Sequence, residues 1–124
     1  MFWRLRLNHQ EGALAESQAL AFLKKQGLKL LERNFACRLG EVDLVMLDQA
    51  TLVFVEVRYR TRSSYGSALD SIDHKKQRKI RRTSAFYLQS QPQHNHRLCR
   101  FDAVAIHGHS SRTGNDLQWI RNAF

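Results

Sequence analysis

Two acidic residues, Asp43 and Glu56, lie in neighbouring apolar runs of the sequence. These runs, Glu41 to Leu47 and Thr51 to Tyr59, are rich in Val, Leu and Phe, which is typical of strands. A tight turn between them would place Asp43 directly opposite Glu56. Like charges in that position destabilise a sheet, and Mg²⁺ or Mn²⁺ would offset the repulsion because hard cations take carboxylate oxygens. The alternative is a solvated face, or neutralisation by neighbours such as Arg58.

Two helical segments each place one charged residue where an apolar one is expected. Glu16 falls within the apolar arc of the segment Glu11 to Gln26, where an unpaired buried carboxylate is costly. Lys76 continues the inner stripe of the segment Ile72 to Ser90, which is set by Ile80, Thr83, Ser84 and Tyr87. In the ordinary interpretation Glu16 reaches water at the edge of the arc and Lys76 snorkels from its helix end. In the other, both join the strand carboxylates in a site suited to metal-dependent phosphodiester hydrolysis.

The chain is strongly basic, with 20 Lys and Arg against 11 Asp and Glu in 124 residues and a formal charge of +9. Such an excess favours a polyanionic partner, with nucleic acid ahead of a membrane or an acidic protein. Much of it lies in two segments, RYRTR and HKKQRKIRR, which flank the acidic centre and are expected to contact phosphates. The residues expected to contact nucleic acid are Arg58, Arg60, Arg62, Lys75, Lys76, Gln77 and Lys79. A surface Gln is ordinary on a helix, so Gln77 is the weakest member of this set.

The remaining patterns predict how these residues are positioned. Further strands are expected at Leu28 to Phe35, Arg100 to His107 and Leu117 to Arg121, which gives the order helix, three strands, helix, two strands. This order predicts an α/β fold with a small mixed sheet flanked by helices. Residues 1–10 are interpreted as an N-terminal extension and residues 11–124 as a single domain. Asp102, in the fourth strand, is expected to pair with Arg100 or a backbone group.

Several protein classes are disfavoured. No apolar run reaches the ~18 residues that a membrane span needs, and the first residues lack the apolar core of a secretory signal. Cys37 and Cys99 are isolated, which suits a reducing compartment. We therefore expect a cytoplasmic protein with no membrane partner.

Several motifs resemble the YraN family of bacterial proteins. They are G-x-x-x-E at Gly12, RN at Arg33, GEVDLV, FVEVRYR, the KQ of Lys76, RFDAVAI and the closing NAF, and they extend from about Gln10 to the end. That family resembles the restriction-endonuclease-like superfamily and its archaeal Holliday-junction resolvases. The resemblance implies a restriction-endonuclease-like fold with a helix Glu, a strand Asp and an E-x-K motif. Carried over, these carboxylates are Glu16, Asp43 and Glu56. A homodimer is expected only by analogy with the superfamily.

One position departs from the superfamily pattern, because Arg58 stands where the motif has Lys. Arg stays charged and does not readily give up a proton. Either Arg58 acts electrostatically, or Lys76 takes over the role, or the site binds nucleic acid without cutting it.

The leading hypothesis is a Mg²⁺-dependent DNA endonuclease acting on branched or recombination and repair DNA. In it, Asp43 and Glu56 bind the metal, Glu16 assists, and Arg58 with Lys76 steadies the phosphate. The second is an inactive nucleic-acid-binding module on the same fold, and a protein-interaction domain ranks third. DNA ranks ahead of RNA as the expected partner, and RNA is kept as an alternative because nothing in the sequence reads a 2′-hydroxyl or displays an aromatic stacking platform.

Overall fold

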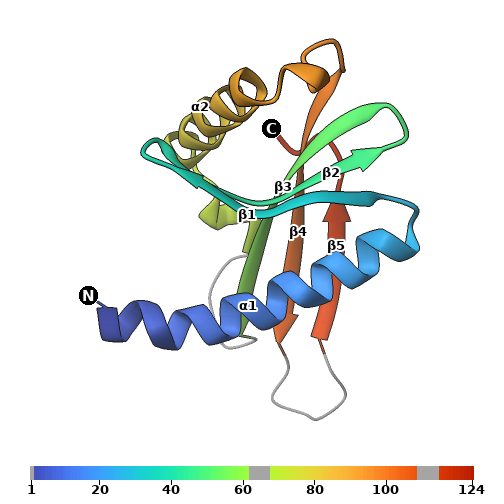
Figure 1. Ribbon diagram of the computed structural model, residues 1–124. Coiled ribbons are helices and arrows are strands. Elements are labelled where there is room, and N and C mark those ends of the chain that lie inside the picture. The colour runs from blue at the N-terminus through green and yellow to red at the C-terminus, as the bar shows by residue number, and fades with distance from the viewer. Residues whose placement is uncertain (1, 62–67, 109–114) are drawn as a thin grey trace.

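The structure is a computed structural model that describes the backbone of residues 2–61, 68–108 and 115–124 (Figure 1). Arg62, one of the predicted nucleic-acid contacts, lies outside these residues. None of the described helices is both long and apolar enough to cross a membrane.

Seven main elements follow one another in the predicted order of helix, three strands, helix and two strands. They are α1 (Phe2–Lys25), β1 (Lys29–Cys37), β2 (Gly40–Asp48), β3 (Thr51–Thr61), α2 (His74–Ser90), β4 (Cys99–Gly108) and β5 (Asn115–Ile120). Short 3-10 helices at Ala68–Ser71 and Pro92–His94 flank α2. The first helix begins at Phe2 rather than at the expected Glu11, so most of the predicted extension is helical.

The five strands form one mixed sheet in the order β1-β2-β3-β4-β5, which confirms the predicted α/β class. Only β3 and β4 are parallel, and α2 lies in the crossover between them. The hairpin of β2 and β3 has the predicted register, with Val45 opposite Phe54 and Leu47 opposite Leu52. Its turn is tight because Gln49 adopts a positive φ of 57°.

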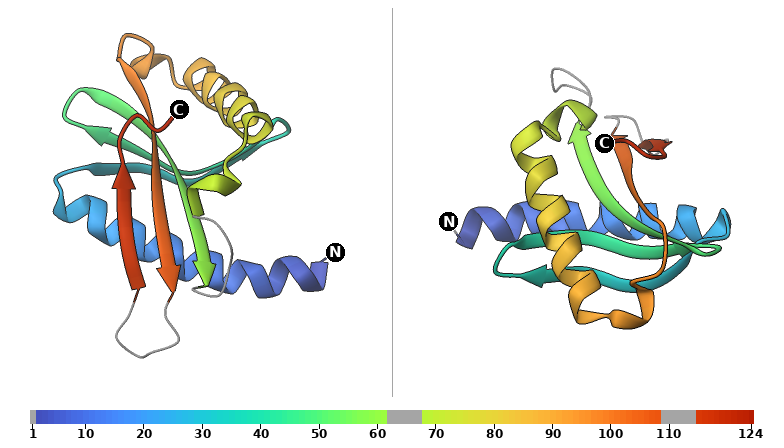
Figure 2. Two further views of the ribbon diagram at one scale, coloured as in Figure 1. Left: turned by 180° about the vertical axis from the view of Figure 1, so that it is seen from behind. Right: turned by 90° about the horizontal axis from the view of Figure 1, so that it is seen from above.

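The two long helices cover opposite faces of the sheet, so the fold has three layers (Figures 1 and 2). On one face, α1 packs Ala15, Ala19 and Leu23 against strand residues that include Leu44, Val55, Val104 and Ile106. On the other face, α2 packs Ile80 and Tyr87 against strand residues that include Val45, Phe54 and Ala103. The buried residues of α2 are the four of the predicted inner stripe.

Candidate functional site

The candidate site lies where the hairpin of β2 and β3 opens. Backbone pairing continues only to Leu44 opposite Val55, one pair short of the predicted pairing of Asp43 with Glu56. Beyond that point, Asp43 Oδ2 accepts a hydrogen bond of 2.8 Å from the backbone N–H of Val57. The carboxylate thus takes the place of a carbonyl acceptor in the ladder. Sequence periodicity predicts the register of the hairpin but not the residue at which its strands separate.

The alternation of side chains along β2 changes at Asp43. Val42 and Val45 both join the α2 side of the core, whereas Leu44 joins the α1 side. Strict alternation would place Val42 with Leu44. Asp43 therefore lies at a local irregularity of β2, where charges on α1 and on the strands β2 and β3 influence its carboxyl group.

The two strand carboxyl groups are close enough to perturb each other. Burial and the charge of Glu56 raise the pKa of Asp43 well above its ordinary value, against the hydrogen bond from Val57, which lowers it. Burial also raises the pKa of Glu56, which is 4% exposed, while Arg58 and Lys76 oppose this rise. A hydrogen bond between the carboxyl groups of Asp43 and Glu56 further lowers the pKa of Glu56, as expected when Asp43 is the protonated partner. Two crowded carboxylates of this kind are an unfavourable pair at neutral pH.

Two cations converge on one oxygen of Glu56. Arg58 Nη2 lies 3.0 Å and Lys76 Nζ lies 3.7 Å from Glu56 Oε2. Lys76 reaches this point from the first turn of α2, where its backbone N–H donates to the N-cap residue Asp73 at 2.8 Å. The Nε of Arg58 is buried and has no acceptor among the described residues, which is costly for a charged group.

The helix carboxylate Glu16 pairs with Arg33, which was not among the predicted site residues. Arg33 Nε lies 3.3 Å from Glu16 Oε1, and Arg33 Nη2 donates to Ala13 O and Ser17 Oγ at 3.0 Å each. Arg33 therefore fastens β1 to α1. The signal available in the sequence was an Arg in the middle of a strand, within the RN motif.

Glu16 and Glu41 also influence the strand pair. Both raise the pKa of Asp43 by their negative charge, and Glu41 raises that of Glu56 as well. Glu41 is exposed and is the second residue of the GEVDLV motif, and it was not among the predicted metal ligands. Within the described residues, no three His, Cys, Asp or Glu side chains form a cluster that could hold a metal ion unaided. The role of Glu16 as a third metal ligand stays a prediction.

Loss of the Arg33 guanidinium should weaken the packing of α1 on β1. We expect Arg33→Met to lower the free energy of unfolding by about 1–3 kcal/mol, since hydrogen bonds to charged groups are worth that much. Chemical denaturation of Arg33→Met, Glu16→Gln and the double variant measures the coupling between the two residues. Arg38→Met, at an exposed arginine in the turn between β1 and β2, is the matched control and should change stability little. If the losses of unfolding free energy in the two single variants add up in the double variant, Arg33 and Glu16 do not form a stabilising ion pair.

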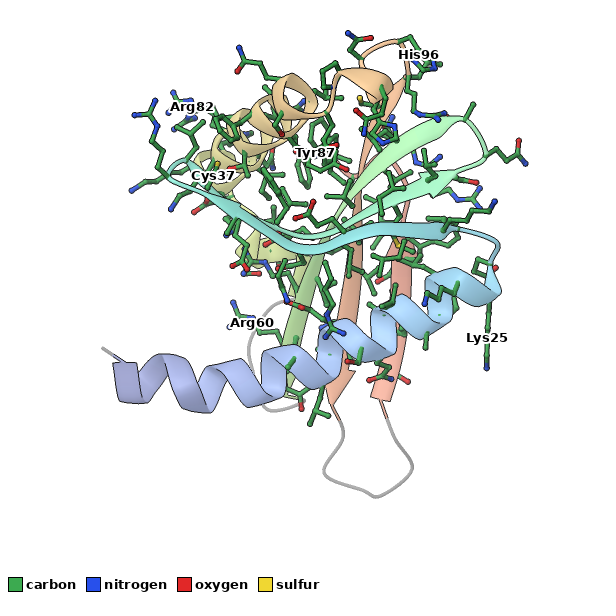
Figure 3. All side chains as sticks on the ribbon, viewed as in Figure 1. Lys25, Cys37, Arg60, Arg82, Tyr87 and His96 are labelled. Carbon is green, nitrogen blue, oxygen red and sulfur yellow. The ribbon has the colours of Figure 1, made fainter. Side chains whose placement is uncertain are left out.

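The predicted nucleic-acid contacts are distributed unevenly around this centre. Arg60, Lys75 and Lys79 are exposed, while Arg58 and Lys76 point inward to Glu56. Gln77 is partly buried, and its side-chain Nε2 donates to Ile72 O at 3.1 Å, which gives this amide a role at the start of α2. Figure 3 shows Arg60 at the end of β3 near α1, away from α2.

Asp102 is a structural anchor, as expected. Its buried carboxylate accepts hydrogen bonds from Arg100 Nε and Nη2, from Trp119 Nε1 at 3.0 Å and from the backbone N–H of Asn122 at 2.9 Å. Arg100 Nη2 also donates to Asp48 Oδ2 at 2.9 Å. The network joins β2, β4, β5 and the C-terminal segment. The Asp102 carboxylate is thus used to hold the fold together.

Comparison with known proteins gives one family. The model of the uncharacterised protein family UPF0102 matches residues 15–106. A UPF0102 protein of Pseudomonas putida strain GB-1 is 52% identical over 113 residues, which cover 91% of each chain. UPF0102 proteins of Alcanivorax borkumensis and Psychromonas ingrahamii are each 48% identical over 120 residues, 97% of this chain and 95% and 93% of theirs. The matched segment contains Glu16, Asp43, Glu56 and Lys76.

Proposed function

We propose that this chain, which belongs to the uncharacterised protein family UPF0102, is a divalent-cation-dependent endonuclease acting on DNA. This is the family that the sequence motifs identified under the name YraN. The observation that carries the proposal is the pair of crowded carboxyl groups, Asp43 and Glu56, with Arg58 and Lys76 beside them.

The donor set fits Mg²⁺ or Mn²⁺. Both ions prefer oxygen ligands, and they are commonly bound through one or two carboxylates with water and substrate phosphate completing the shell. Asp43 and Glu56 would hold the ion, and its charge would relieve the repulsion that raises both of their pKa values. When bound, the ion supplies positive charge to phosphate oxygens and makes water a better nucleophile near neutral pH.

The neighbouring cations would bind the substrate. Arg58 is permanently charged, and its Nη2 pairs with Glu56 while its Nε has no acceptor among the described residues. After a small rearrangement, a phosphate oxygen could accept a hydrogen bond from this Nε–H. Lys76 approaches Glu56 from α2, which packs on the sheet, so a phosphate beside Glu56 would meet cations from both a strand and a helix. Together they would stabilise the negative charge that develops during hydrolysis.

The exposed basic residues Arg60, Lys75 and Lys79 would hold the strands on either side of the scissile phosphate. Branched or recombination and repair DNA is the substrate class that we favour, and the cytoplasm is the compartment. DNA is preferred to RNA in this proposal only by the resemblance to DNA-cleaving relatives of the superfamily.

The test is metal-dependent cleavage of a labelled DNA panel that contains nicked, branched, single-stranded and blunt duplex substrates. We expect cleavage of at least one in Mg²⁺ or Mn²⁺ and none after chelation. The double variant Asp43→Ala, Glu56→Ala, purified in the same way, controls for contaminating nucleases. Equal cleavage by this variant would overturn the proposal.

A binding module without turnover is the second candidate, and Arg58 in the position of the motif Lys is the observation that favours it. It predicts DNA binding whose affinity falls steeply with salt, with no metal-dependent products. Arg58→Lys separates the two candidates. If the position limits chemistry, we expect this variant to cleave at least ~10-fold faster than the wild type, whose activity would be weak or nil. Arg121→Lys, at an exposed arginine with no role in the proposed site, is the matched control and should leave the rate unchanged.

A further inference from the structure

A groove runs between the C-terminal half of α2 and the turn that joins β1 to β2. Its volume is about 670 Å³, within the range of small-molecule sites. Leu39 of the turn lies on one wall, and Arg82, Phe86 and Gln89 of α2 line the other, with Asn95 beyond the helix end. None of its eight lining residues is acidic. The lining therefore combines apolar side chains with polar and basic ones.

Phe86 presents an aromatic ring to this groove. It is 38% exposed, which is unusual among the large apolar side chains that the structure describes. The Phe35 ring centroid lies 6.4 Å away with the ring planes inclined by 31°, and Phe35 itself meets Tyr87 edge-on at 5.0 Å. Phe86 is thus braced by core aromatics, so little side-chain entropy would be lost when a planar group stacks on it.

The opposite wall is held close to the helix. A Cβ on Gly40 would lie only 2.8 Å from Thr83 Oγ1 and 3.2 Å from Lys79 Cγ, so the β1–β2 turn packs tightly against α2 at this point. Any other residue at position 40 would push turn and helix apart. The close approach of the turn to α2 beside the groove consequently requires glycine at position 40.

A row of cations connects the groove with the candidate active site. Lys75, Lys79 and Arg82 are exposed, and their spacing of four and three residues places them on one flank of α2. Figure 3 shows Arg82 on the side of α2 near the β1–β2 turn, and the exposed Arg38 lies in that turn. Ten residues of helix separate Lys76 from Phe86, a distance of about 15 Å. This length corresponds to about four nucleotides of a strand at ~3.4 Å each.

We infer that the groove is a subsite for an unpaired base of the nucleic acid whose phosphates follow Lys75, Lys79 and Arg82. The base would stack on Phe86, and Gln89 and Asn95 would donate to or accept from its edge. The nature of the ligand rests on the proposed function, but base binding does not require cleavage. The exposed cations Lys75, Lys79 and Arg82 lead to the groove, and its lining has no acidic residue. Both features favour a nucleic-acid base with its attached phosphates over a cationic or a purely apolar ligand. The preferred substrate then carries an unpaired base about four nucleotides from the scissile phosphate.

The test is fluorescence anisotropy with a forked DNA that has a single-stranded arm and with a blunt duplex of the same length, in EDTA so that nothing is cleaved. We expect Phe86→Ala to weaken binding of the fork by about 5- to 150-fold, the range measured for base–aromatic stacking, and to change duplex binding less than twofold. Phe86→Trp should retain the affinity. Leu98→Ala, at another exposed apolar residue away from the groove, is the matched control. Thermal unfolding checks that each variant is folded.

Abasic substitutions along the arm identify the base. Removing the base that occupies the groove should weaken wild-type binding and abolish the difference between wild type and Phe86→Ala, whereas other abasic positions should not. Equal binding of the fork by wild type and Phe86→Ala, or no binding of nucleic acid at all, would overturn the inference. A wild type that cleaves while Phe86→Ala binds normally refutes the subsite alone. Phe86-dependent binding without metal-dependent cleavage refutes the nuclease proposal alone.

Discussion

Asp43→Asn is expected to abolish metal-dependent cleavage while making the protein more stable. The amide keeps an oxygen that can accept from the Val57 N–H at the opening of the hairpin, so the fold is preserved. It removes one of the two negative charges that would hold the cation, and we expect turnover to fall by at least ~10³-fold.

The gain in stability follows from the direction of the pKa shift. Burial first, and the charge of Glu56 second, raise the pKa of Asp43 above its ordinary value of 3.8. Between that value and the raised pKa, the folded state binds more protons than the unfolded state, so stability falls as pH rises through this window. Above the window the ionised carboxylate carries the full cost. Asn carries none of this cost, and we expect it to raise the free energy of unfolding at neutral pH by about 1 kcal/mol, or roughly 4 °C in Tm.

Thermal unfolding from pH 3 to 8 measures this effect, together with a Mg²⁺ titration at neutral pH. Wild type and Asp43→Asn should converge at the lowest pH and diverge as pH rises, and Mg²⁺ should raise the Tm of the wild type alone. Asp48→Asn, on the same strand but in the Arg100 network, is the matched control and should not be stabilised. A variant that is less stable than the wild type at neutral pH, or one that still cleaves, would contradict the assignment of Asp43.

Asp102→Ala is expected to have the largest effect on stability. It would leave the guanidinium of Arg100, the indole N–H of Trp119 and the backbone N–H of Asn122 without their shared acceptor. Removing one partner of a buried ion pair costs about 3–5 kcal/mol. For a chain of this length the loss corresponds to roughly 10–20 °C in Tm, enough to leave a marginal domain partly unfolded.

Urea denaturation of Asp102→Ala and Asp48→Ala compares two carboxylates that bind the same arginine. Asp48 is partly exposed and makes one contact of 2.9 Å with Arg100, so its removal should cost about 1 kcal/mol or less. Asp102→Asn keeps one oxygen that can accept hydrogen bonds, so its loss of unfolding free energy should lie between those of the two alanine variants. Equal losses of unfolding free energy in the two alanine variants would show that the buried network of Asp102 contributes no more to stability than the partly exposed Asp48–Arg100 pair.

The elements and the hairpin register were predictable because they depend on local patterns. Strand composition and a two-residue turn predict that Val45 lies opposite Phe54, and helical spacing predicts that Ile80 and Tyr87 face the sheet. Lys76 was found in the same way, as a charge on an otherwise inner stripe, and it contacts Glu56. The pairing of Asp102 with Arg100 needed only their separation by two positions on a strand.

Features that depend on contacts between distant elements were not predictable. The separation of the strands at Asp43 depends on how a side chain competes with a backbone carbonyl, which periodicity does not encode. Arg33 is 17 residues from Glu16 in the sequence, and the groove beside Phe86 exists because a turn packs on a helix more than 40 residues later. The sequence accordingly displays no stacking platform, although the folded chain presents an exposed ring.

The parallel pairing of β3 with β4 determines the order in which the charges come together during folding. All the carboxylates of the candidate site lie between Glu16 and Glu56, within α1 and the first three strands, which are neighbours along the chain. The first parallel pair, Leu52 with Cys99, closes a loop of about 50 residues that contains α2, and long loops close late because of their entropy. We therefore expect the acidic hairpin to form before Lys76 docks on it. A nascent chain would pass through a stage with its carboxylates gathered and this counter-charge absent, and a divalent cation present then would act as a folding ligand as well as a cofactor.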